Sequence, residues 1–453
     1  MIREFSSFRD SSGFVFQADK EIYRYISVEY KDNYDFACVS GLYDLLTEKQ
    51  LLVKHHEIDV EKFDKTAYKI LQVDKIPFIS YPYEWSFSEY KDAALLTLKI
   101  QKRALLKGMS LKDASAYNIQ FKDGKPIFID TLSFEKLEEN HPWVAYKQFC
   151  QHFLAPLALM YYKDERLNAL MKNYIDGIPL DLASRLLPKI TSFGILSHIH
   201  MNAMFQKLYA SSRKDKNNFG GMNLKKHIAL IENLYRTISS FKKKNSQTEW
   251  KDYYDFKNYD ETAFAHKGDI LLKFLNQIQK PELIWDIGAN NGYFSKIASE
   301  TGAQVIAFDI DSEAVDQNYK NNKRPERVLP LLLDVLNPSP DIGWANKERL
   351  CINQRTHPDA IMALALIHHL SISNNIPFDY VAAYFSSLSK YLIIEFVPKE
   401  DSQVQILLSS RKDIFPNYNQ AFFEKCFQKY YTILESQNVK NSKRVMYLMV
   451  SKN

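Results

Sequence analysis

Residues 283–295 read LIWDIGANNGYFS: an apolar run, a turn that carries Gly288 and Gly292, and the start of a helix. The apolar run predicts a buried strand that passes through Asp286 and leads into the turn. Glycine has no Cβ, so the backbone of the turn can adopt positive φ angles and come close to a ligand. Open α/β sheets bind their ligands outside the carboxyl ends of the strands, so this turn is a candidate ligand site.

The sequence on either side of this stretch repeats the same rhythm. Apolar runs at Gln304–Asp309, Asp359–Leu364 and Tyr391–Phe396 alternate with helical segments. Strands that alternate with helices are typical of a parallel sheet with helices on both faces. The sequence therefore predicts an α/β, Rossmann-like sheet for this part of the chain.

Acidic residues follow the second and third strands of that sheet. Asp309 comes 23 residues after Asp286 and is suited to accept hydrogen bonds from ribose hydroxyls, in NAD as well as in S-adenosylmethionine. The glycine spacing is G-x-x-x-G and lacks the G-x-G-x-x-G pattern of pyrophosphate binders. A third apolar run ends at Asp334, and the fourth strand is followed by His368 and His369. These last two elements favour S-adenosylmethionine.

Together the four elements resemble the motif series of class I S-adenosylmethionine-dependent methyltransferases, over about 200 residues. The resemblance implies that the cofactor-binding residues are Asp286, Gly288, Asn290, Gly292, Asp309 and Asp334. Asp286, Gly288 and Gly292 would line the amino-acid end of the donor. Asp309 would hold the ribose, and Asp334 would face the adenine. We interpret Asp311, two residues after Asp309, as the N-terminal cap of the next helix. The segments 430–435 and 444–450 match the antiparallel hairpin that closes such sheets.

Two residues are candidates for catalysis. His368 follows the fourth strand, where it either accepts a proton from the acceptor or closes the pocket by packing. Glu395, at the end of the fifth strand, is the second candidate. No N/D-P-P-Y/F element follows the fourth strand, and its absence disfavours planar amino nitrogens of DNA as acceptors. We expect a small-molecule or glycan acceptor that is methylated on oxygen or nitrogen.

A second constellation lies between residues 111 and 130. Asp113, Asn118 and Asp130 resemble the catalytic loop and metal-binding acid of protein kinases and aminoglycoside phosphotransferases. The resemblance implies an N-terminal α+β, kinase-like domain with a phosphotransfer or metal site for ATP and magnesium. Leu111 stands where this family has histidine, and no glycine follows Asp130. In the alternative reading, these side chains make loop hydrogen bonds in a domain that recruits the acceptor.

The phosphate-anchoring cation of such a site is not fixed by the sequence, because both Lys20 and Arg24 lie in the right region. The polar stretch Lys242–Lys251 is the best candidate for a linker. We therefore predict a kinase-like region at 1–140, a mostly helical extension and linker at 141–250, and the methyltransferase domain at 251–453.

Composition limits the remaining alternatives. The 453 residues carry a net charge of only +5, which does not indicate a nucleic-acid binder. The 4 cysteines are scattered without metal-ligand spacing, and no run is long and apolar enough to span a membrane. We expect a cytoplasmic enzyme, and the sequence leaves its oligomeric state open.

The whole arrangement resembles bacterial two-part methyltransferases, some of them associated with host-specific nodulation. Three functions follow from it. The first is a methyltransferase whose N-terminal domain recruits or modifies the acceptor. The second is a bifunctional phosphotransferase–methyltransferase, and the third is a non-catalytic scaffold that binds a ligand as a signal.

Overall fold

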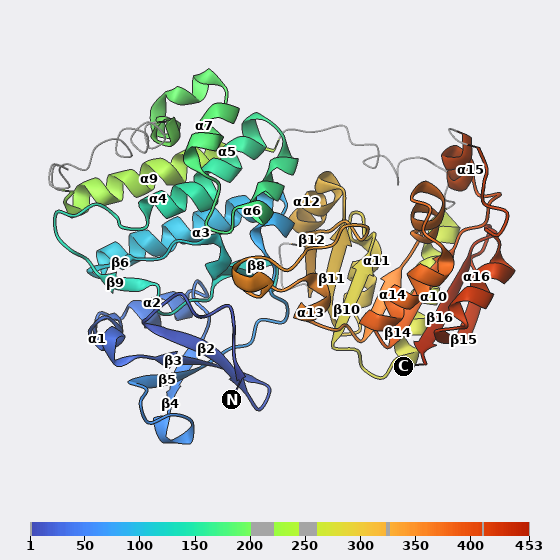
Figure 1. Cartoon of the computed structure of the whole chain (residues 1–453), viewed down its shortest axis with the longest axis horizontal. Helices are drawn as coiled ribbons and strands as arrows, with labels where there is room; N and C mark the ends of the chain where they lie inside the picture. Colours follow the sequence, from blue (N-terminus) through green and yellow to red (C-terminus); the bar gives the residue numbers. More distant parts are fainter. Residues whose placement is uncertain (1, 201–221, 244–260, 323–326, 410–411, 453) are drawn as a thin grey trace. The chain divides into compact units, whose positions relative to one another are not determined.

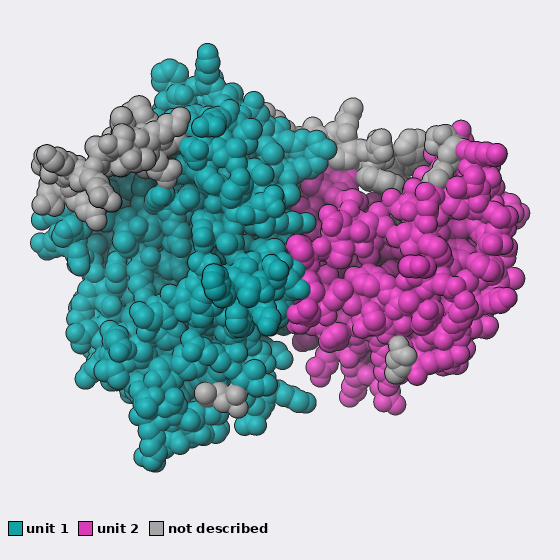
Figure 2. Space-filling model, viewed as in Figure 1, with its two compact units in different colours: residues 1–244, 341–350 teal, residues 245–340, 351–453 magenta. Residues whose placement is uncertain are grey.

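The computed structural model describes residues 2–200, 222–243, 261–322, 327–409 and 412–452. The chain divides into two compact units, which Figure 2 colours separately: Met1–Lys244 with Asp341–Leu350, and Asn245–Pro340 with Cys351–Asn453. Most of the predicted linker, from residue 244 onward, lies outside the described residues. The stretch 141–243, expected as a separate extension, belongs to the same unit as residues 1–140.

The C-terminal unit is built on a sheet of seven strands (Figure 1). The strands are β10 (Leu283–Ile287), β11 (Gln304–Asp309), β12 (Val328–Leu332), β13 (Ala360–Ala363), β14 (Tyr391–Phe396), β15 (Tyr431–Asn438) and β16 (Val445–Ser451). Their order is β12-β11-β10-β13-β14-β16-β15. The first five are parallel, and β16 pairs antiparallel with both β14 and β15. The predicted parallel sheet and its closing hairpin are confirmed.

Helices cover both faces of this sheet. They are α10 (Glu261–Gln277), α11 (Tyr293–Ser299), α12 (Ser312–Asn321), α13 (Ile352–Arg355), α14 (Phe378–Leu388), α15 (Ser402–Ser409) and α16 (Gln420–Phe427). Buried side chains of α10, such as Phe274, share a core with Ile284 and Met362 of the sheet. Alternate side chains of the strands face the other way, and there Phe396 of β14 contacts Phe423 of α16. Because side chains alternate along a strand, each strand serves both cores.

The N-terminal unit begins with an antiparallel sheet in the order β1-β2-β3-β5-β4. Its strands are β1 (Ile2–Arg3), β2 (Gly13–Ala18), β3 (Glu21–Ile26), β4 (His55–Ile58) and β5 (Lys69–Val73). Helices α1 (Lys31–Val39) and α2 (Leu42–Glu48) follow β3. The sequence runs 13–17 and 21–28 predict two strands here, and both are present as β2 and β3, with β3 two residues shorter than predicted.

The rest of this unit is largely helical. After the 3-10 turn η3 (Pro82–Glu84) come α3 (Phe87–Leu106), α4 (Tyr146–Phe149), α5 (Ala155–Tyr162), α6 (Leu170–Asn173), α7 (Leu180–Leu186) and α9 (Leu224–Ser240). A π-helical segment, Cys150–Leu154, joins α4 to α5. The short strands β6 (Met109–Leu111) and β9 (Phe134–Lys136) pair with each other, as do β7 (Ile119–Lys122) and β8 (Lys125–Phe128). The helical pattern at 90–106 predicts a helix, and the two runs 118–121 and 126–129 around a turn predict a hairpin; they correspond to α3 and to the pair β7 and β8. Within the described ranges, no helix is long and apolar enough to cross a membrane.

Residues 341–350 were not expected in the N-terminal unit, because the sequence places them between β12 and β13. Glu348 in this segment is 2% exposed and receives two hydrogen bonds from the Arg9 guanidinium, at 2.5 and 2.9 Å. The guanidinium of Arg349 lies 4.3 Å from the centre of the Tyr117 ring. This ion pair joins residues that lie far apart in sequence, which local sequence patterns do not reveal.

Candidate active site

The candidate methyltransferase residues come together at one edge of the C-terminal sheet. In the observed strand order, Asp334 follows β12, Asp309 ends β11, Gly288 follows β10, His368 follows β13 and Glu395 ends β14. These five strands are parallel neighbours, so their carboxyl ends share one edge. From β10 the chain builds the sheet outward in one direction through β11 and β12, and then in the other direction through β13 and β14. Open α/β sheets bind ligands at such a switch point, here between β10 and β13.

The glycine turn after β10 has the backbone shape that the sequence predicted. Gly288, Asn290 and Gly292 have φ angles of 81°, 49° and 83°. The backbone N–H groups of Gly288 and Ala289 both donate to the carbonyl of Phe308 at 2.9 Å, which ties the turn to the end of β11. A Cβ atom on residue 292 would lie 2.3 Å from the side-chain oxygen of Asn318, so this position requires glycine.

Asp309 faces this turn from the neighbouring strand. One carboxylate oxygen accepts from the backbone N–H of Asn290 at 2.7 Å, and the other accepts from the N–H of Asp311 at 2.9 Å. Burial raises the pKa of Asp309 to about 6. Each carboxylate oxygen can accept more than one hydrogen bond, so both retain capacity for ribose hydroxyls. Asp311 itself caps α12 by accepting from the N–H of Glu313 at 2.8 Å, which confirms its reading as a helix cap.

Asp286 and Asp334 lie at the two ends of the proposed donor site. Asp286 is 2% exposed and accepts a hydrogen bond of 2.6 Å from the hydroxyl of Ser295. Burial raises the pKa of Asp286 to about 6, an effect that the nearby ammonium of Lys267 opposes. Asp334 is partly exposed, and one of its oxygens accepts from the N–H of Leu336 at 2.9 Å. The other oxygen has no hydrogen bond in the described part of the chain and can therefore accept one from a ligand.

His368 is completely buried, and neither ring nitrogen has a hydrogen-bond partner within the residues that the structure describes. Burial first, and the positive charges of Arg444 and Lys267 further, hold its pKa well below the usual value. The imidazole is therefore neutral at pH 7, with a lone pair available to accept a proton. Both ring nitrogens are buried, so a role as a base requires that the bound acceptor reach one of them; without that contact His368 is a packing residue.

Glu395, the second catalytic candidate, is held by two cations. Its Oε2 atom lies 2.5 Å from the ammonium of Lys267, and its Oε1 atom lies 3.7 Å from the guanidinium of Arg444. Sequence reasoning did not single out either cation. Lys267 belongs to the helix before β10 and lies 128 residues from Glu395, so no motif joins the two.

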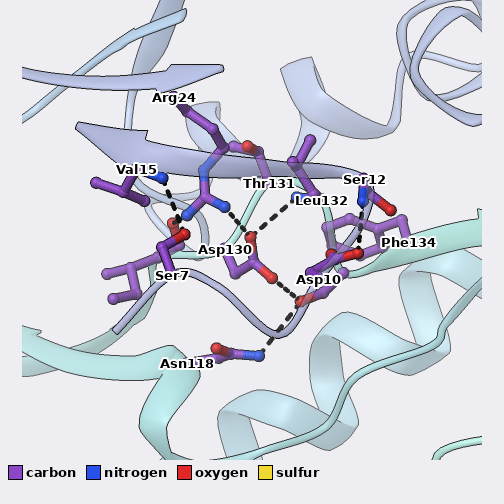
Figure 3. A network of polar contacts seen from close by, with 12 residues as sticks. Ser7, Asp10, Ser12, Val15, Arg24, Asn118, Asp130, Thr131, Leu132 and Phe134 are labelled. Carbon is purple, nitrogen blue, oxygen red and sulfur yellow. Dashed lines mark hydrogen bonds and ion pairs between the residues drawn. The ribbon is translucent and has the colours of Figure 1, made fainter. Parts of the chain in front are cut away.

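Two of the candidate phosphotransfer residues, Asn118 and Asp130, lie close together in the N-terminal unit (Figure 3). Asp130 pairs with the guanidinium of Arg24 at 2.5 Å and accepts from the backbone N–H of Leu132 at 3.1 Å. Its second oxygen accepts from the hydroxyl of Ser133, which in turn accepts from the side chain of Asn118 at 3.3 Å. Arg24, one of the two cations left open by the sequence, is thus placed at the site.

Asp113 completes this group. Its carboxylate accepts from the backbone N–H of Ser115 at 2.9 Å and interacts with the side chains of Asn118 and Gln148. Burial first, and the charge of Asp130 second, raise the pKa of Asp113. Lys20, the other candidate anchor, is exposed in the turn between β2 and β3.

Two buried tyrosines fix the backbone around Asp130. The hydroxyl of Tyr43, on α2, donates to the carbonyl of Thr131 at 2.8 Å. The hydroxyl of Tyr30 donates to the carbonyl of Phe134 at 2.6 Å. Neither residue was identified from the sequence, since their role depends on the packing of α2 and the segment before α1 against the hairpin region.

Comparison with known proteins gives the following matches. The nodulation protein NoeA of Rhizobium meliloti (strain 1021) is 34% identical over 452 residues, which cover 97% of this chain and 94% of that protein. The hexuronic acid methyltransferase AglP of Haloferax volcanii is 31% identical over 77 residues, 17% of this chain and 32% of that protein. The N-methyltransferase NodS of Bradyrhizobium japonicum WM9 aligns over 43% of this chain and 99% of its own, with 10% identity and a TM-score of 0.33. No family model matches the chain.

Proposed function

Because this chain belongs to the family of the nodulation protein NoeA and is an S-adenosylmethionine-dependent methyltransferase, we propose that it methylates an oxygen or nitrogen of a glycan or small-molecule acceptor. The observation that carries this proposal is the single sheet edge at which Asp334, Asp309, Gly288 and His368 follow four neighbouring parallel strands. In this proposal Asp334 serves the adenine, Asp309 the ribose and the glycine turn the amino-acid end, and His368 lies beside that turn.

The residues of the site fit the donor. Asp309 accepts the ribose hydroxyls, because its two oxygens are already oriented by the N–H groups of Asn290 and Asp311. The glycine turn lets the backbone approach the amino-acid end, and Asp286 faces its ammonium. When bound, S-adenosylmethionine supplies an electrophilic methyl group on a positively charged sulfur. The protein contributes alignment of the two reactants and exclusion of water.

His368 is the proposed proton acceptor for an acceptor hydroxyl or ammonium. It is neutral at pH 7, it lacks a competing hydrogen bond among the described residues, and it follows the strand beside the glycine turn. A carboxylate acceptor carries no proton at pH 7, so methyl ester formation needs no such base.

The partial match to a hexuronic acid methyltransferase makes sugar acids the first acceptors to test. We propose a screen of hexuronic acids, amino sugars and oligosaccharides with isotopically labelled donor. Incorporation of label into one of these classes, lost in Asp309→Ala, supports the proposal. Label transfer only to nucleic acid, or none to any acceptor class despite donor binding, contradicts it.

The N-terminal unit has a second candidate function, phosphotransfer from ATP. The observation that favours it is the cluster of Asp113, Asn118 and Asp130 with Arg24 at its side. Two half-buried carboxylates that repel each other suit a divalent cation, and the guanidinium of Arg24 on β3 suits a phosphate. In this role Asp130 and Asn118 would hold magnesium, and Asp113 would orient the acceptor hydroxyl.

If phosphotransfer is absent, the same unit recruits the acceptor. The two roles are separated by incubating the full chain with γ-labelled ATP, magnesium and the acceptor found in the methylation screen. Label on the acceptor supports phosphotransfer. Methylation that loses acceptor affinity when Asp113 is replaced, without any phosphorylation, supports recruitment.

A further inference from the structure

The amino-acid end of the donor carries two charges, an ammonium and a carboxylate. Asp286 can face the ammonium, but neither the sequence motifs nor the glycine turn provide a cation for the carboxylate. A cation for this carboxylate must come from another element of the unit, and its assignment rests on the proposed donor site.

Lys267 lies beside the glycine turn although it comes from the preceding helix, α10. Its ammonium is 4.7 Å from the centre of the Phe294 ring, two residues beyond Gly292. It is also close enough to Asp286 for its charge to lower the pKa of that carboxyl. Lys267 is only 3% exposed. A lysine is seldom buried to this degree without a specific partner.

The face of the sheet explains why these groups meet. Ile284 of β10 and Ile393 of β14 belong to the core that α10 covers. Asp286 and Glu395 each lie two residues further along the same strands. Side chains two residues apart on a strand point to the same face. Asp286 and Glu395 therefore point toward α10, which carries Lys267.

A chain of opposite charges holds Lys267 in place. The carboxylate of Glu395 accepts a hydrogen bond of 2.5 Å from the Lys267 ammonium and lies 3.7 Å from the guanidinium of Arg444. Two nitrogens of that guanidinium donate to the carboxylate of Asp401, at 2.7 and 2.9 Å. Burial of such charges is expensive, and apolar side chains of similar size often stabilise a fold better. Buried networks with perturbed pKa values are frequent at functional sites.

The charges also match the donor. Within the network, the cations Lys267 and Arg444 balance the anions Glu395 and Asp401, so that Asp286 remains as one negative charge. S-adenosylmethionine carries a sulfonium, an ammonium and a carboxylate, and therefore a net charge of plus one. An ammonium has three N–H donors, so Lys267 can hold Glu395 and a second carboxylate together.

We propose that Lys267 binds the carboxylate of the methyl donor, and that Glu395 and Arg444 are positioning residues that hold its ammonium beside the glycine turn. Glu395 then acts through Lys267 and has no role as a base.

Calorimetry with two ligands tests this assignment. Decarboxylated S-adenosylmethionine differs from the donor only by the missing carboxylate. The wild-type full chain should bind the donor about 10- to 100-fold more tightly than the decarboxylated ligand, the range for a hydrogen bond to a charged partner. Lys267→Met should lose this preference by weakening the donor alone. Lys267→Arg, which keeps the charge, should restore part of the preference.

A matched control lies on the same helix. Lys273 is exposed and pairs with Glu435, so Lys273→Met should change neither affinity. If Lys267→Met weakens both ligands equally, or neither, Lys267 is a structural counter-ion and the assignment is overturned. A wild-type protein that binds both ligands equally also overturns it. If the folded wild type binds neither ligand, the proposed donor site itself is wrong, and the assignment with it.

Discussion

Removal of the Asp309 carboxylate is the perturbation whose effect follows most directly from the structure. Its two oxygens are fixed by the N–H groups of Asn290 at 2.7 Å and Asp311 at 2.9 Å, and each retains capacity for one ribose hydroxyl. A hydrogen bond to a charged acceptor contributes about 1.5–3 kcal/mol. We expect Asp309→Ala to weaken S-adenosylmethionine binding by at least this amount, which is roughly 10- to 150-fold in Kd.

Isothermal titration calorimetry on the full chain measures this loss, with S-adenosylhomocysteine as a second ligand. Because Asp309 also supports the turn, Asp309→Asn, which keeps one acceptor oxygen, should lose less affinity than Asp309→Ala. Asp311→Ala is the matched control. It removes the cap of α12, at a stability loss of about 1 kcal/mol, and should leave donor affinity nearly unchanged.

The pH dependence gives an independent check on Asp309. Its pKa is raised to about 6, so acidification from pH 7 to pH 5 should protonate it and weaken donor binding. The same acidification should have less effect on Asp309→Ala. Unchanged donor affinity in a folded Asp309→Ala protein would refute the site, and NAD binding of equal strength would assign the unit to the dinucleotide binders.

Four further outcomes are expected. His368→Asn should slow methylation of a hydroxyl acceptor by roughly 100-fold at constant donor affinity. In the wild type, the fall of the methylation rate with acidification should lie below pH 6.5, and a variant that loses donor affinity together with rate would indicate a packing role. The buried Asp286 has a pKa raised to about 6, so the folded state keeps the proton of this carboxyl to a higher pH than the unfolded state does. In chemical denaturation, the wild type should therefore lose stability relative to Asp286→Asn as the pH rises from about 4 to about 6. ATP should raise the melting temperature of the full chain only with magnesium present, and Asp130→Ala should abolish this shift; a shift without magnesium would exclude the metal role. Gly292→Ala should lower the melting temperature, because its Cβ would overlap Asn318 and its φ is 83°; an unchanged temperature would mean that the turn rearranges freely.

The sequence predicted the C-terminal sheet well because its signals are local. The bounds of β10, β11 and β14 agree with the apolar runs, since strands buried on both faces are continuous in apolar residues. The third strand was placed less well. The apolar run that leads to Asp334 starts at Leu331, directly after Pro330, whereas β12 begins at Val328 and includes Pro330. Among the residues that the structure describes, β12 is an edge strand that pairs only with β11, and proline is tolerated on the unpaired side of an edge strand.

Interactions across long sequence distances were beyond prediction. Arg24 could not be preferred over Lys20 until the sheet placed it against Asp130, 2.5 Å away. Lys267 had no motif of its own, because it reaches Glu395 only when α10 packs on the sheet. The segment 341–350 reads as a connection between two strands, and its place in the N-terminal unit depends on its own tertiary contacts, such as that of Glu348 with Arg9. Local periodicity thus predicted the strands and the sheet edge at which the candidate residues lie. The ion pairs of Arg24 with Asp130 and of Lys267 with Glu395 became visible only in the folded structure.

The most direct test of the central claim is a crystal structure of the full chain with S-adenosylhomocysteine bound. The account predicts the adenine beside Asp334, both ribose hydroxyls on the Asp309 carboxylate, and the amino-acid end over the glycine turn with its carboxylate at Lys267. A ligand bound away from the carboxyl ends of β10, β11 and β12, or with its ribose turned from Asp309, would contradict the claim.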